Sequence, residues 1–423
     1  EGNAWTYNKP TDSYYLHYFS RKQPDLNWEN PEVRQEIFDM MRFWFDKGID
    51  GFRMDSISLI AKDPSFPLID SKKYPDIFSF YAKEPRLHLY LHEMNRQVLS
   101  KYDCMSVGEG SAVAKFVDPA REELNMLYHF DAARIRNTTL PDNPESGIDY
   151  SLIALKKMFT EWDKAVDKGW PSIYLGNHDQ PRMVSRFGSD KDEFRALSAK
   201  MLITFLLTMK GTPYWFAGDE IGMRNIRFDR IENYNDIDTI NRYKKAKAEG
   251  KDPQAVLDEQ KETGRDNART PFQWDRSPEA GFTAGTPWLK VNPDYTWINV
   301  TDEEKDPTSI LNYFKKVVSF RKENPSLIYG SYHLLDAENP QSYTFLRKTG
   351  ADTYLIMLNF SPKAAISTPG IDMSNAHVLL DNYGARSHMA PQKDITLRPF
   401  EAIVFQLNHP VYESFIDSLD LLE

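Results

Sequence analysis

Three acidic residues each follow a short apolar run that is typical of a β-strand. Asp55 ends the run GFRMD, Glu109 lies within SVGEG, and Asp179 lies within IYLGNHDQPR. Helix-sized intervals separate them, which predicts the C-terminal ends of strands in a (β/α) barrel, where barrel enzymes hold their catalytic groups. One carboxylate can attack an anomeric carbon, a second can protonate the leaving oxygen, and a third can hold sugar hydroxyls as positive charge develops. The three together are what glycosidic bond cleavage requires.

Two basic residues accompany these carboxylates. Alternate residues of a strand share a face, so Arg53 and Asp55 are predicted to lie together, and the fixed positive charge would keep a nucleophilic Asp55 ionised. Glu109 must instead arrive protonated, so its site is expected to raise its pKa. Taken alone, Arg53 and Asp55 are more typical of a buried structural ion pair, and His178 of a core histidine bonded to a backbone carbonyl.

The runs GFRMD, VGEG and GNHDQPR, in this order, resemble three signature regions of the α-amylase family, glycoside hydrolase family thirteen. The resemblance extends over nearly the whole chain. It implies that Asp55 is the nucleophile, Glu109 the general acid/base and Asp179 the transition-state stabiliser. It also places Arg53 and His178 in the sugar-binding subsite. The implied mechanism is retaining, with a covalent glucosyl intermediate on Asp55.

Two further runs resemble one subgroup of that family, which holds oligo-1,6-glucosidases, α-glucosidases, trehalose-phosphate hydrolases and sucrose isomerases. These are QPDLN at 23–27 and GRDNARTPFQW at 264–274. The second resembles a loop at the entrance of the substrate pocket, which makes Arg265 and Asp266 candidate substrate-binding residues. The guanidinium group of an Arg can donate hydrogen bonds to two sugar hydroxyls at once. Arg265 and Asp266 could also simply pair with each other to hold the loop, and both interpretations can be true together.

The residue after the nucleophile is associated with linkage preference in that subgroup, with Val for α-1,6 and Thr for α-1,4 substrates. Ser56 matches neither, so a mixed preference is expected of this substrate-binding candidate. Gln180 matches the hydrolases, whereas several sucrose isomerases have Asn. The expected activity is therefore release of α-glucose from the non-reducing end of short α-gluco-oligosaccharides or disaccharides. The alternatives are a sucrose isomerase or transglucosylase, and an inactive truncated fragment or sugar-binding relic.

The composition suits a large globular protein with a neutral substrate. The 423 residues suggest two or three domains, and 41% are hydrophobic. The net charge of −10 argues against nucleic acid or an anionic membrane surface as a partner and leaves a small neutral α-glucoside. Cys104 has no second cysteine to bond, and no apolar run is long enough to span a membrane. A cytoplasmic location is expected, with the periplasm as the alternative.

The expected fold is α/β, a (β/α)8 barrel followed by an antiparallel β-sandwich. We expect residues 1–22 to end an inserted loop domain, 23–333 to supply strands four to eight, 334–408 to form the sandwich and 409–423 an acidic tail. The family's first three β/α units are not recognisable, so the chain is expected to lack them, and an N-terminal polypeptide could complete the barrel. No cofactor is expected, and any calcium site would lie in that N-terminal part.

Overall fold

The computed structural model describes two compact units of the chain. The described residues are 3–68, 70, 80, 85–110, 114–129, 151–166, 168–350, 352–373, 376–384 and 393–407. One unit comprises Glu1–Asp131 and Lys164–Pro171, the other Ala132–Asp163 and Ser172–Glu423, and each is described by itself. The boundaries expected near residues 22 and 333 stay predictions. The acidic tail at 409–423 lies outside the described residues.

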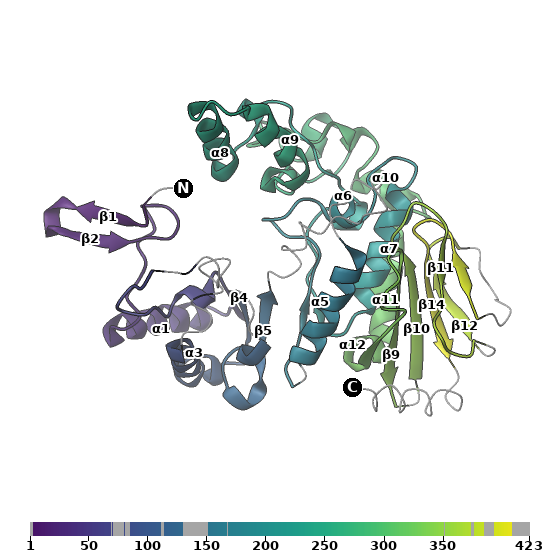
Figure 1. Cartoon of the computed structure of the whole chain (residues 1–423), viewed down its shortest axis with the longest axis horizontal. Coiled ribbons are helices and arrows are strands. Elements are labelled where there is room, and N and C mark those ends of the chain that lie inside the picture. The colour runs from purple at the N-terminus through teal and green to yellow at the C-terminus, as the bar shows by residue number, and fades with distance from the viewer. Residues whose placement is uncertain are drawn as a thin grey trace. The chain divides into compact units, whose positions relative to one another are not determined.

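The first unit alternates helices with parallel strands after an N-terminal hairpin. The hairpin pairs β1 (Trp5–Asn8) antiparallel with β2 (Ser13–Leu16). The elements that follow are α1 (Pro31–Asp46), β3 (Gly51–Met54), α3 (Pro85–Gln97), β4 (Met105–Gly110) and β5 (Met126–His129). The three strands form a parallel sheet in the order β3, β4, β5, with α1 and α3 next to each other beside it (Figure 1). The strands predicted at Asp55 and Glu109 are thus confirmed.

The ends of α1 fix where β3 begins. The side chain of Asn30 accepts the Glu32 N–H at 2.9 Å and caps the start of the helix. The chain leaves the helix at Gly48, whose φ of +93° lies in the left-handed region that glycine adopts without strain. Phe38 and Phe45 are buried on one face of the helix. The strand that carries Arg53 therefore starts at a defined position.

The second unit begins with helices and a pair of short strands. The helices are α5 (Leu152–Ala165), α6 (Met183–Phe187), α7 (Arg195–Thr208), α8 (Ile237–Ala248), α9 (Pro253–Thr263), α10 (Val300–Lys305), α11 (Ile310–Glu323) and α12 (Ser326–Tyr329). The strands β6 (Ser172–Ile173) and β7 (Thr212–Pro213) pair in parallel. Nearly every residue of α7 is buried, which agrees with its strongly apolar sequence.

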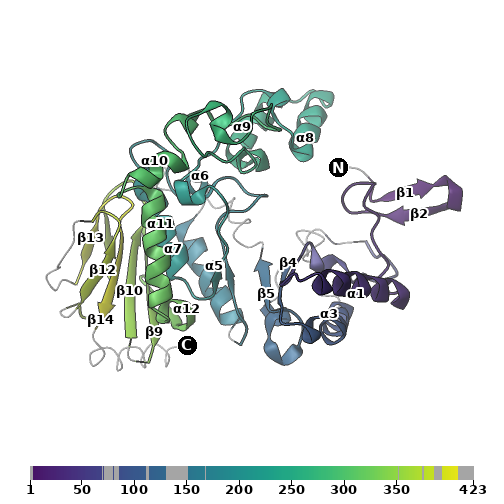
Figure 2. The same cartoon turned by 180° about the vertical axis from the view of Figure 1, so that it is seen from behind.

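The C-terminal part is antiparallel β-structure, as predicted. Five strands lie in the order β12 (His377–Asp381), β14 (Ala402–Leu407), β10 (Asp352–Asn359), β9 (Ser342–Thr349) and β8 (Ser331–Leu335). A second sheet pairs β11 (Ala365–Ser367) with β13 (Ile395–Leu397). Leu355 and Met357 of the large sheet share a buried cluster with Ile395 and Leu397 of the small one. Figure 2 shows α11 and α7 beside the large sheet, and Phe205 of α7 shares a buried cluster with Tyr343 of β9.

The five strands expected of the barrel are found as two sheets. Among the described residues, β3, β4 and β5 form one parallel sheet and β6 with β7 another. The alternation of strands and helices agrees with an α/β barrel, and a closed ring of strands is not seen in the described parts of the chain. No helix within the described ranges is both long and apolar enough to cross a membrane.

Candidate active site

The first unit brings Arg53, Asp55 and Glu109 together at the C-terminal ends of β3 and β4. The two strands are parallel neighbours, with Arg53 opposite Val107 in the register. Arg53 Nη1 donates to Asp55 Oδ1 at 2.5 Å, and Arg53 Nη2 lies 2.5 Å from Glu109 Oε1. One guanidinium therefore bridges two carboxyl groups, as the alternation of side chains along the strand predicted for Arg53 and Asp55.

The two carboxyl groups have different surroundings. The Asp55 side chain is 68% exposed, whereas that of Glu109 is 8% exposed. Burial and, next, a hydrogen bond with the Asp55 side chain raise the pKa of Glu109, the positive charge of Arg53 opposes both, and the pKa is about 7 as a result. Partial burial alone would lower the pKa of Arg53, but Glu109 and Asp55 raise it overall. A neutral acid thus lies beside an exposed carboxylate, the pairing that acid-assisted displacement needs.

The glycines on either side of Glu109, Gly108 and Gly110, let the segment after β3 pack closely against β4. A Cβ on Gly108 would lie 2.8 Å from Ile57 Cγ2, and one on Gly110 would lie 3.2 Å from Ser58 Oγ. Ser56 adopts a left-handed conformation, with φ of 48° and ψ of 34°, and its backbone N–H binds the Glu109 carboxyl group. The structure therefore gives the Ser56 backbone a definite role beside Glu109, and a contact of its hydroxyl with substrate stays a prediction.

The second unit places Asp179 among three basic side chains. Arg269 Nη2 donates to Asp179 Oδ1 at 2.6 Å, and Arg265 Nη1 lies 3.4 Å from the same oxygen. His178 Nε2 lies 3.4 Å from Asp179 Oδ2. The side chain of Asn177 accepts the Asp179 N–H at 2.8 Å and so fixes the turn after β6. The histidine is exposed and next to a carboxylate, which favours the site interpretation over a core histidine.

Asp266 is buried and bonded to the backbone of a neighbouring segment. It is 1% exposed, and its Oδ2 accepts the backbone N–H groups of Asn235 at 2.7 Å and Asp236 at 2.9 Å. The buried N–H groups at the start of α8 need an acceptor, and Asp266 supplies it. Arg265 instead pairs with Asp236, whose Oδ1 lies 2.9 Å from Arg265 Nη2. Asp266 therefore orders the loop behind Arg265, and its contact with substrate stays a prediction.

Two residues of this cluster are absent from the predicted site. Arg269 makes the shorter of the two Arg contacts with Asp179, and its Nε also donates to the His178 carbonyl at 2.8 Å. Its position within the ARTP part of the predicted loop is a signal that could have found it. Asp236 lies in no recognised motif, and only the fold brings it to Arg265.

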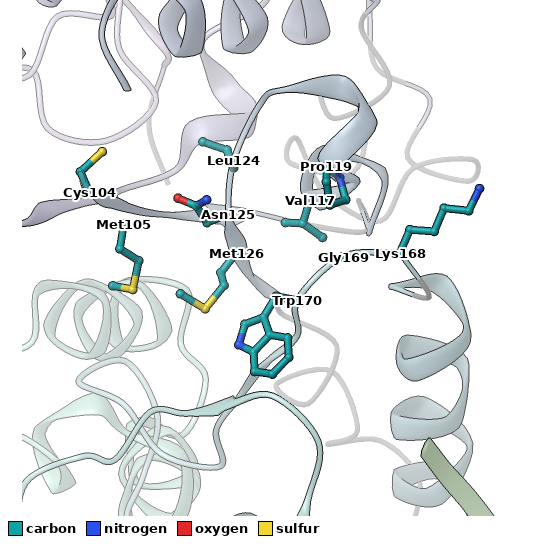
Figure 3. Close-up of a pocket in the computed structure, with 10 residues that line it drawn as sticks. All are labelled: Cys104, Met105, Val117, Pro119, Leu124, Asn125, Met126, Lys168, Gly169 and Trp170. Carbon is teal, nitrogen blue, oxygen red and sulfur yellow. The ribbon is translucent and has the colours of Figure 1, made fainter. Parts of the chain in front are cut away.

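A separate cavity of the first unit lies at the other end of its strands. It has a volume of about 500 Å³, and its lining includes Met105 and Met126, which begin β4 and β5, and Trp170. Figure 3 shows Lys168 extending away from these apolar side chains. Barrel enzymes hold their chemistry at the C-terminal strand ends, so this cavity is not the candidate site. Among the described residues, no group of three or more His, Cys, Asp and Glu side chains could hold a metal ion.

Comparison with known proteins agrees with the motifs. The model of the alpha amylase catalytic domain matches residues 1–330. The chain is 47% identical over 424 residues to an oligo-1,6-glucosidase of Parageobacillus thermoglucosidasius, covering 97% of this chain and 74% of that protein. It is 45% identical to an oligo-1,6-glucosidase of Bacillus cereus, covering 96% and 74%.

A solved structure is also similar. A mutant of the trehalulose synthase MutB superimposes with a TM-score of 0.87 at 37% identity, covering 96% of this chain and 74% of that one. Because the family model spans most of the chain and the relatives match nearly all of it, the chain belongs to the α-amylase family.

Proposed function

We propose that this chain is a retaining α-glucosidase, which releases glucose from the non-reducing end of short α-gluco-oligosaccharides or disaccharides. The observation that carries the proposal is the Arg53-bridged pair, an exposed Asp55 beside a buried Glu109. The relatives named oligo-1,6-glucosidase favour α-1,6-linked glucosides as the substrate class.

In the first step, Asp55 attacks the anomeric carbon while Glu109 gives its proton to the glycosidic oxygen. The bond to the leaving group breaks, and a glucosyl ester forms on Asp55. In the second step, the Glu109 carboxylate takes a proton from water, and that water attacks the anomeric carbon and releases Asp55. Two inversions give net retention of the anomeric configuration.

Asp179 supplies the stabilising charge in this proposal. Its contacts with Arg269, Arg265 and His178 hold the carboxylate in place, so its oxygens can accept hydrogen bonds from sugar hydroxyls that become more acidic in the transition state. The side chain of His178 is 53% exposed and has a second ring nitrogen for a hydroxyl group.

Replacing the nucleophile tests the proposal. Asp55→Asn should lower turnover of isomaltose and of p-nitrophenyl α-glucoside by about 10⁴-fold, because an amide does not form the ester. Asp39→Asn, in an exposed ion pair of α1, is the matched control and should leave turnover unchanged. Undiminished turnover by the Asp55→Asn protein would refute the mechanism.

Isomerisation of sucrose is the second candidate, because a trehalulose synthase mutant is similar in structure. The same glucosyl ester would then be captured by a fructose hydroxyl in place of water. Incubation with sucrose separates the two, since hydrolysis yields glucose and fructose, and isomerisation yields a new disaccharide. We expect glucose and fructose.

A further inference from the structure

The first unit contains a largely buried ion pair that the proposed mechanism does not use. Asp25, from the run QPDLN, places Oδ1 2.6 Å from Lys62 Nζ, and the two side chains are 20% and 10% exposed. Burial raises the pKa of Asp25 and lowers that of Lys62, and in each case the hydrogen bond and the charge of the partner oppose the effect. Because taking two charges out of water is costly, stability alone is a weak reason for such a pair.

The pair holds the end of the turn that follows Asp55. Lys62 Nζ also donates a hydrogen bond to the carbonyl of Leu59, the last residue of the short 3-10 helix η2 (Ile57–Leu59). The Asp25 N–H donates to the Leu16 carbonyl of β2 at 2.9 Å. The carboxylate that binds Lys62 is therefore itself attached to the hairpin, and Lys62 connects it to η2.

The same turn carries the backbone contact with Glu109. The Ser56 carbonyl accepts the Leu59 N–H at 2.9 Å, and the Ser56 N–H binds the Glu109 carboxyl group. The φ of Ser56 is 48°, a left-handed conformation that a non-glycine residue keeps only where its surroundings impose it. A continuous series of contacts thus connects Asp25 with Glu109, through Lys62, Leu59 and Ser56.

We propose that Asp25 and Lys62 are positioning residues for the acid, because they fix the turn whose Ser56 N–H binds Glu109. This inference rests on the proposed function, in which Glu109 gives the proton. All of the residues in the series belong to one compact unit. The Ser56 N–H stabilises the ionised carboxyl group and so lowers the pKa of Glu109. A loosened turn should therefore raise that pKa and misalign the proton.

The test uses Lys62→Met and the double variant Asp25→Asn with Lys62→Met. The single variant loses the Leu59 contact and leaves Asp25 as a buried carboxylate without its cation. The double variant also removes that charge, so it should be the more stable of the two in urea unfolding. Both should lower kcat/KM for isomaltose by about 10-fold or more, mainly through kcat. The basic limb of both pH profiles should lie about 0.5–1 pH unit above that of the wild type.

Arg34→Met is the matched control. Arg34 Nε lies 2.7 Å from Glu93 Oε2, and Nη1 donates to the Trp28 carbonyl at 2.7 Å. Like Lys62, this cation joins a carboxylate to a backbone carbonyl within the first unit, but it does not contact η2 among the described residues. The Arg34→Met protein should lose stability and keep the basic limb of the wild type.

The pKa of Glu109 can also be measured without turnover. In protein labelled with ¹³C at the glutamate carboxyl carbon, the Glu109→Gln variant identifies the signal to be titrated by NMR. If the wild type cleaves no isomaltose, the proposed function is wrong, and a raised pKa in the double variant would still support the positioning of Glu109.

Three results bear on the inference alone. A double variant with the pKa and the pH profile of the wild type would overturn it, whatever the stability of the protein. An equal change in the Arg34→Met protein would also overturn it, since loss of stability would then account for the effect. If Lys62→Met does not fold, the double variant decides, because its buried site holds no unpaired charge.

Discussion

Arg53 Nη2 lies 2.5 Å from Glu109 Oε1, and the positive charge of Arg53 opposes the rise in the pKa of Glu109 that burial causes. Burial and the neighbouring Asp55 raise the pKa of Glu109, whereas the guanidinium lowers it. The same Arg53 holds the candidate nucleophile through its other terminal nitrogen. One cation thus acts on both catalytic candidates.

Removing that cation should therefore change both the rate and its pH dependence. We expect Arg53→Met to lower kcat/KM for isomaltose by about 100-fold or more, since orientation and charge are lost together. The basic limb of the pH profile should move to higher pH, because the group that lowers the pKa of Glu109 is gone. Arg230→Met, in an exposed pair with Glu232, is the control. An unshifted basic limb in the Arg53→Met protein would contradict this account.

The pH dependence of kcat/KM of the wild-type protein should reflect the ionisation of Glu109. Because the acid must arrive protonated and its pKa is about 7, kcat/KM should fall as the pH rises above about 7. Glu109→Gln should lose activity on isomaltose but keep much of the first step with α-glucosyl fluoride, whose leaving group needs no proton. A profile that stays level up to pH 9 would show that Glu109 is not the acid.

The free energy of unfolding should also depend on pH through Glu109, in a direction that its raised pKa fixes. The folded pKa of about 7 lies above the ordinary value of 4.5, so the stability associated with protonated Glu109 is full below pH 4.5 and is lost as the pH rises through 7. Relative to wild type, Glu109→Gln should gain up to about 3 kcal/mol between pH 4 and pH 8. Urea unfolding at the two pH values measures this gain, and a constant difference would contradict it.

A structural feature could be predicted from the sequence where it depends on residues close to each other in the chain, and not where it depends on contacts between distant segments. The helix α1 and the strand β3 follow from local signals, an Asn cap, a glycine stop and a short apolar run, and the structure has both. The bridge from Arg53 to Asp55 follows from side-chain alternation along one strand. The pairing of β4 with β3 and β5 depends on contacts between distant segments, which no local pattern contains.

The Asp179 cluster shows where that limit lies. Motif and spacing predicted Asp179, His178 and Arg265 as site residues, and the structure places His178 and Arg265 next to Asp179. The hydrogen bonds of Asp266 could not be predicted, because the backbone N–H groups at 235–236 that it satisfies belong to another segment, about 30 residues earlier in the chain. Asp236 was missed for the same reason.

Arg269 should matter more than Arg265 for holding Asp179. Arg269 bonds both the Asp179 carboxylate and the His178 carbonyl, and a lysine reaches only one of them at a time. We expect Arg269→Lys to lower kcat/KM for isomaltose by about 10- to 100-fold. Arg265→Lys should cost less, because its contact with Asp179 is 3.4 Å long. The reverse order in steady-state kinetics would contradict the geometry.

Ser56 should be sensitive to the shape of its replacement. Its φ of 48° is costly for a β-branched residue and free of strain for glycine. Ser56→Val should therefore be less stable than Ser56→Gly by about 1–2 kcal/mol, measured by urea unfolding. Equal stabilities would show that the left-handed turn relaxes, and the Glu109 contact with the Ser56 N–H would then be lost in the valine protein.

Arg347 tests what holds the C-terminal sheet to the rest of its unit. It is fully buried, and its guanidinium donates to the carbonyls of Thr208 at 2.9 Å, Gly330 at 2.6 Å and Ser331 at 3.2 Å. Arg347→Met keeps most of the volume but leaves these acceptors without their donor, at a cost of about 3–5 kcal/mol. Arg276→Met breaks only an exposed pair with Asp302 and should cost less than about 1 kcal/mol. Urea unfolding should show this difference, and similar losses in the two proteins would mean that β9 is held by its apolar contacts alone.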